Sequence, residues 1–98
     1  MKPEDLSIEK KLIQLAEEAA ELAQAAIKVI RASDGDTPVD IKTAWENMLE
    51  EIADIEVCVD VLVDIEDSMR ILKIYQEKYD RWSERLNGRS EVSEVHTE

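Results

Sequence analysis

The first half of the chain is built around the segment Leu15-Ala16-Glu17-Glu18-Ala19-Ala20-Glu21-Leu22. Every residue in it is a leucine, an alanine or a glutamate, which are among the strongest helix formers. Outward from this segment, apolar residues at helical spacing share one face: Leu12, Leu15, Ala16, Ala19, Leu22, Ala23, Ala26 and Ile30. The pattern predicts a helix from about Ser7, as its N-cap, to Ala32, followed by a turn at residues 33–36.

A second helical segment contains Leu49-Glu50-Glu51-Ile52-Ala53-Asp54. Thr37 is expected to cap this helix, with Pro38 at the first helical position, and the apolar pattern continues to about Ile65. Because this helix is apolar on two sides, we expect it to be buried on two sides. A third helix is predicted from about Met69 to Leu86, with Asn87-Gly88 as its C-terminal stop.

These elements predict an all-α fold, a helical bundle of three main helices per chain. The helical domain is expected to cover residues 1–87, and residues 88–98 are expected to form a flexible polar tail. Three helices of this size cannot cover the second helix on both faces. We therefore expect homo-oligomerisation to complete the bundle, as a homodimer or a dimer of dimers.

The composition excludes several classes of protein. The chain has 24 acidic and 12 basic residues, a net charge of -12, which argues against binding to nucleic-acid polymers. A single cysteine allows no internal disulfide, so a cytoplasmic location is the default expectation. No apolar run approaches the roughly 20 residues of a membrane span, so no membrane partner is expected.

Four carboxylates on the first two helices form two pairs with the same spacing. Glu18 and Glu21 are three residues apart, and so are Glu51 and Asp54, so each pair is adjacent on its helix. If the helices pack antiparallel, the four side chains converge and repel one another unless a cation binds. Oxygen ligands without histidine favour Mg²⁺, with Mn²⁺ as a substitute. The alternative is that these acids only solvate the helix surfaces.

The acidic segments also resemble a known family. Glu17-Glu18-x-x-Glu21, a spacer, and then Glu51-x-x-Asp54 resemble the signature of MazG-like nucleoside triphosphate pyrophosphohydrolases, within the all-α NTP pyrophosphatase superfamily. The resemblance covers roughly residues 8–86. It implies that Glu18, Glu21, Glu51 and Asp54 are catalytic Mg²⁺ ligands. It further implies cleavage of a (d)NTP between the α and β phosphates, giving (d)NMP and pyrophosphate, as nucleotide-pool housecleaning.

The third helix carries a cluster of basic residues that suits a phosphate. Lys78, Arg81 and Arg85 lie on one flank of an apolar face, and Lys78-x-x-Arg81 resembles a basic element found after the acidic block in small MazG-like proteins. They are candidates for phosphate binding. Equally, they could form bridges to the abundant acids, with the lysine stem lying along apolar surface.

The identity of the substrate base stays open at this point. Within the superfamily, dUTP, dCTP and phosphoribosyl-ATP are all possible substrates. The contrasting interpretation is a non-catalytic helical interaction module, with solvated acidic faces and an apolar surface that binds another protein.

Overall fold

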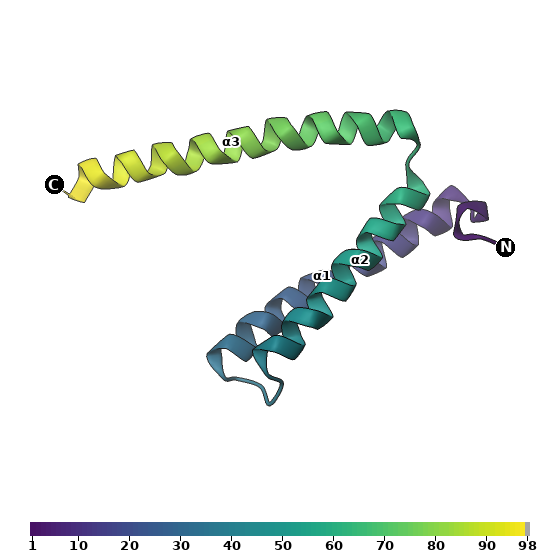
Figure 1. Cartoon of the computed structure of the whole chain (residues 1–98), viewed down its shortest axis with the longest axis horizontal. Coiled ribbons are helices and arrows are strands. Elements are labelled where there is room, and N and C mark those ends of the chain that lie inside the picture. The colour runs from purple at the N-terminus through teal and green to yellow at the C-terminus, as the bar shows by residue number, and fades with distance from the viewer. Residues whose placement is uncertain (98) are drawn as a thin grey trace. The chain divides into compact units, whose positions relative to one another are not determined.

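The computed structural model describes the backbone of residues 1–97 and the side chains of residues 1–88. Its elements are a short 3₁₀ turn, η1 (Pro3–Asp5), and three α-helices, α1 (Ile8–Asp34), α2 (Ile41–Leu62) and α3 (Ile65–Thr97) (Figure 1). The described residues contain no strand, which confirms the predicted all-α class. None of the helices in this part of the chain combines the length and apolar character that a membrane crossing requires.

The limits of α1 follow from its two capping groups. The Ser7 hydroxyl oxygen accepts a hydrogen bond from the backbone N–H of Lys10 at 3.2 Å, which confirms Ser7 as the N-cap. At the other end Gly35 adopts φ 77°, and the N–H of Asp36 donates to the carbonyl of Arg31 at 2.9 Å. This left-handed glycine cap ends α1 at Asp34, two residues beyond the predicted Ala32.

The predicted start of α2 is wrong by three residues. The N-cap is Asp40, whose Oδ1 accepts the N–H of Thr43 at 2.7 Å, and the helix begins at Ile41. Thr37 instead accepts the N–H of Val39 at 3.4 Å, so Thr37 and Pro38 belong to the preceding loop. An ionised carboxylate accepts a shorter and stronger hydrogen bond than a hydroxyl does, which favours Asp40 as the cap.

The boundary between the second and third helices also differs from the prediction. The second helix ends at Leu62 and not at Ile65, and the third begins at Ile65 and not at Met69. The reason is Asp64, whose Oδ1 accepts the N–H of Asp67 at 2.8 Å and whose carbonyl accepts the Ser68 hydroxyl at 3.0 Å. These bonds satisfy the first turn of α3.

The predicted stop at Asn87-Gly88 is wrong, since α3 continues through it to Thr97. Gly35 is the glycine with a positive φ among the described residues, and Gly88 lies inside the helix. A single glycine costs a helix only about 1 kcal/mol, which is too little to end a long one. The mobility of the tail stays a prediction, because the side chains of residues 89–98 and all of residue 98 lie outside the described residues.

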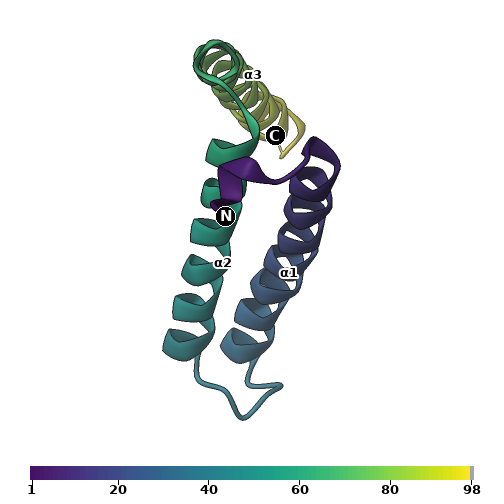
Figure 2. The same cartoon turned by 90° about the vertical axis from the view of Figure 1, so that its right-hand side faces the viewer.

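The chain divides into two compact units, Met1–Val63 and Asp64–Glu98. Within the first unit, α1 and α2 lie side by side and are joined by a short loop, so they run antiparallel (Figure 2). The η1 turn contacts α2. The second unit consists of α3.

The interface between α1 and α2 follows a repeat of alternating four- and three-residue steps, which is the repeat of coiled coils. On α1 the least exposed side chains include Lys11, Leu15, Glu18, Leu22, Ala25, Val29 and Ala32. On α2 they include Ala44, Met48, Glu51, Ile55, Cys58 and Leu62. Ala25 and Ala44 are the most buried, at 7% and 3% exposed. Two glutamates therefore occupy positions that such an interface normally gives to apolar residues.

Candidate metal centre

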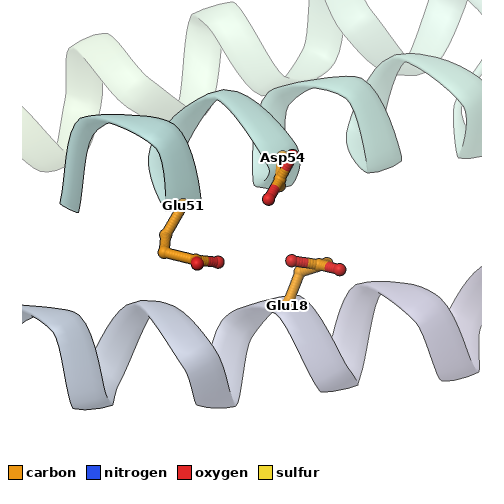
Figure 3. A group of neighbouring side chains, drawn as sticks. All are labelled: Glu18, Glu51 and Asp54. Atoms are coloured by element: carbon orange, nitrogen blue, oxygen red, sulfur yellow. The ribbon is translucent and has the colours of Figure 1, made fainter. Parts of the chain in front are cut away.

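Three carboxylates from two helices meet at the α1–α2 interface. Glu18 extends from α1, and Glu51 and Asp54 extend from α2 into the same space (Figure 3). One carboxylate oxygen of each residue lies within 4.8 Å of the corresponding oxygens of the other two. Antiparallel packing puts these residues together, because Glu18 and Glu51 both belong to the interface repeat and Asp54 lies about one turn beyond Glu51.

Two oxygens of this group are buried and unsatisfied. The Oε2 atoms of Glu18 and Glu51 are inaccessible to solvent, and neither has a hydrogen-bond partner. The other oxygen of Glu18, Oε1, accepts a hydrogen bond from Gln14 Nε2 at 2.8 Å. A buried oxygen without a partner is unfavourable, and more so when it belongs to a charged group. The interface thus contains two acceptors that a cation would satisfy.

The electrostatics of the group are those of crowded carboxylates. Burial raises the pKa of Glu18, the negative charges of Glu21 and Asp54 raise it further, and the Gln14 hydrogen bond partly opposes them. Burial also raises the pKa of the Cys58 thiol, with smaller contributions from Glu18 and Asp54. Both shifts indicate a site that resists additional negative charge and would gain from a positive ion.

The donor set fits a hard divalent cation. It consists of carboxylate oxygens alone, two of which have no other partner, and it contains no histidine. Mg²⁺, Mn²⁺ and Ca²⁺ prefer such ligands, whereas Zn²⁺ favours nitrogen and sulfur. Glu18, Glu51 and Asp54 are therefore the residues that would hold a metal.

The fourth predicted ligand, Glu21, lies outside the group of three. It is exposed on α1, and its charge acts on Glu18. The three-residue spacing correctly predicts that Glu21 lies beside Glu18, but it does not predict which acids of the two helices meet. Gln14 was not among the predicted site residues, although the four-residue spacing from Gln14 to Glu18 is a recognisable signal for a side-chain pair on a helix.

A cavity of about 480 Å³ adjoins the acidic group within the first unit. Glu18 and Asp54 form part of its wall, so the acids open directly into it. Its other lining residues are Met1, Lys2, Pro3, Leu6, Lys11, Gln14, Val57, Cys58 and Val61. Its volume is within the usual range of small-molecule sites, and its walls are mostly apolar with a few polar groups, as such sites commonly are.

The predicted phosphate-binding residues are all on the other unit. Lys78, Arg81 and Arg85 are exposed on α3, at a spacing that places them on one side of the helix. The ion pair within residues 1–88 joins Arg70 and Asp67 at 3.8 Å and includes none of these three. Within this part of the chain, the bridging interpretation of the three basic residues is therefore not realised.

Comparisons of the chain with protein-family models, with curated proteins and with solved structures each found no match.

Proposed function

We propose that this chain is a Mg²⁺-dependent nucleoside triphosphate pyrophosphohydrolase. It would cleave a (d)NTP between the α and β phosphates, giving (d)NMP and pyrophosphate, and would act in nucleotide-pool housecleaning in the cytoplasm. The observation that carries the proposal is the pair of buried, unpartnered oxygens of Glu18 and Glu51, which lie on facing helices beside Asp54. The resemblance of the acidic segments to the MazG-like signature supports the choice of reaction.

The positions of Glu18 and Glu51 argue against a purely solvating role for these two residues. Solvating acids belong on exposed surfaces, where Glu17 and Glu50 lie. Glu18 and Glu51 instead occupy interface positions that an apolar residue would stabilise. Retaining charge at both positions is unfavourable without a ligand, as is typical of sites where function conflicts with local stability.

Each residue of the site would have its own role in the reaction. Glu18, Glu51 and Asp54 would hold the metal, and Gln14 would orient Glu18 through its amide. A bound Mg²⁺ would polarise the scissile phosphate and lower the pKa of the attacking water. Glu21, next to Glu18 and exposed, could complete the ligand set or accept a proton from that water.

Phosphate contacts by Lys78, Arg81 and Arg85 form a second part of the proposal. All three are exposed, and none has an ion-pair partner within residues 1–88, so they are available to an anionic ligand. Guanidinium groups suit phosphate oxygens because they can donate two parallel hydrogen bonds.

Self-association is the third part. Large apolar side chains on all three helices are exposed, including Ile30 at 60%, Trp45 at 50% and Leu72 at 69%. A surface with so many apolar groups needs a partner, and a second copy of the chain is always available at matching concentration. We propose a homodimer or a dimer of dimers.

The deciding experiment measures pyrophosphate release from the four ribo- and four deoxyribonucleoside triphosphates, with and without Mg²⁺. Activity that requires Mg²⁺ and is lost in Glu51→Gln and Asp54→Asn supports the proposal. Glu50→Gln is the matched control, because Glu50 is the exposed neighbour of Glu51. Circular dichroism should show all three variants folded. No release from any nucleotide would favour the non-catalytic interaction module.

A further inference from the structure

The lining of the cavity beside the acidic group is chemically mixed. Glu18 and Asp54 are its acidic residues, and Lys2 and Lys11 are its basic residues. Val57, Cys58 and Val61 of α2 add apolar surface, and the N-terminal segment adds Met1, Pro3 and Leu6. A ligand that suits this lining would combine an anionic, metal-binding group, an apolar surface and hydrogen-bonding atoms.

The spacing along α1 sets how far Lys11 lies from Glu18. Lys11 precedes Glu18 by seven residues, or two helical turns, which is about 10 Å along the axis. Side chains on a helix tilt toward its N-terminus, so the Lys11 side chain leads away from Glu18. Gln14 lies between them, and its amide is already bonded to Glu18. The Lys11 ammonium is thus suited to bind the part of a ligand that lies farthest from the metal.

Lys11 differs from its neighbour Lys10 in a way that matters for binding. Lys11 is half-buried and lines the cavity, whereas Lys10 is exposed and is not part of the lining. Lys11 also has no ion-pair partner within residues 1–88. No acidic side chain within residues 1–88 therefore competes with a ligand for its ammonium group, which carries three N–H donors.

Resting on the proposed function, we infer that this cavity takes the nucleoside end of the substrate and that Lys11 selects its base. An ammonium group donates hydrogen bonds and accepts none. Guanine offers two adjacent acceptors, O6 and N7, and thymine and uracil offer O4, whereas adenine and cytosine carry an amino donor in place of that keto oxygen and adenine keeps N7 alone. The selected substrates are keto-base nucleotides, with the apolar wall covering the faces of the base.

Cys58 allows a test that does not depend on turnover. It is the single cysteine of the chain, and it lines the cavity, so its alkylation by iodoacetamide reports on occupancy of this one place. Because burial raises the pKa of the thiol, the reaction is followed at alkaline pH. Protection by dGMP and by dAMP, each with Mg²⁺, is compared in the unmodified chain and in Lys11→Gln, Lys11→Arg and Lys10→Gln.

We expect dGMP to protect Cys58 at lower concentration than dAMP does. Lys11→Gln should raise the half-protecting concentration of dGMP about tenfold and leave that of dAMP unchanged. Lys11→Arg should retain the preference for guanine because it retains the donors, and Lys10→Gln should behave as the unmodified chain.

Three results would overturn the inference: no protection by either nucleotide, equal weakening of dGMP and dAMP in Lys11→Gln, or the same effect in Lys10→Gln. The pyrophosphate-release panel separates this failure from failure of the proposed function. Mg²⁺-dependent hydrolysis without base-dependent protection would refute only the role of Lys11 and the cavity. Base-dependent protection that Lys11→Gln removes, without hydrolysis of any nucleotide, would support the binding pocket and refute the enzyme.

Discussion

Glu18 on α1 and Glu51 on α2 meet across the helix interface, and the Oε2 atom of each is buried without a hydrogen-bond partner. Two requirements conflict at these positions in the hairpin formed by α1 and α2. Packing favours apolar residues at both positions, whereas the proposed metal centre requires the carboxylates. The same two residues are therefore expected to limit the stability of the metal-free chain and to control its response to divalent cations.

Removal of Glu51 or Asp54 should abolish catalysis while leaving the helices intact. Glu51→Gln and Asp54→Asn retain side-chain size but remove a metal-binding charge, so Mg²⁺-dependent pyrophosphate release should fall by about 100-fold or more. Steady-state kinetics and circular dichroism measure the two properties separately. If either variant unfolds, the carboxylate has a structural role that this prediction does not allow.

Glu18→Gln should stabilise the metal-free chain. The substitution removes a negative charge that burial, Glu21 and Asp54 all disfavour. Thermal unfolding in the presence of a chelator should therefore shift upward. Glu17→Gln, on the exposed neighbouring position, should leave the melting temperature nearly unchanged.

Mg²⁺ should raise the melting temperature of the unmodified chain, because a ligand that binds only the folded state stabilises it by mass action. The rise should continue with the logarithm of the Mg²⁺ concentration once the site is saturated, and Glu18→Gln should reduce it. The matched measurement with Na⁺ at equal ionic strength removes general screening. An equal shift with Na⁺ would contradict a specific site.

Asp40 should make the stability of the α1–α2 hairpin depend on pH. The hydrogen bond from the Thr43 N–H to its carboxylate lowers the pKa of Asp40 in the folded chain. Because the pKa of Asp40 is lower in the folded chain, the unfolded state binds more protons at pH values around and between the two pKa values. The stabilisation from this carboxylate is therefore fully present above the unfolded pKa and is lost as the pH falls through the folded pKa. Asp40→Asn keeps a capping oxygen without a titrating charge, and its melting temperature should depend less on acidification below about pH 4.

The two glycines should respond in opposite ways to substitution by alanine. Gly35 has φ 77°, so Gly35→Ala should destabilise the fold by about 1 kcal/mol even though open space surrounds it. Gly88 lies inside α3 with open space around it, so Gly88→Ala should increase helix stability by up to about 1 kcal/mol. Denaturation followed by circular dichroism measures both, and destabilisation by Gly88→Ala would contradict a continuous α3.

The sequence alone was sufficient for the helical class and for the parts of the site that lie on one helix. Local composition and spacing identified three helices, the Ser7 cap and the turn at Gly35, because each depends on residues close together in the chain. They also identified the pairs Glu18 with Glu21 and Glu51 with Asp54. The helix boundaries were predicted less well, since Asp40 and not Thr37 caps α2, and Gly88 does not end α3.

The tertiary structure decided which of the predicted acids meet. Antiparallel packing partly buries Glu18 and Glu51 at the interface and brings the exposed Asp54 beside them, whereas Glu21 lies outside the group. This packing also creates the cavity that joins Lys11 to the acids, a grouping that no local pattern indicated. Spacing along one helix places side chains relative to their neighbours, but only the partner helix determines which of them lose their contact with water.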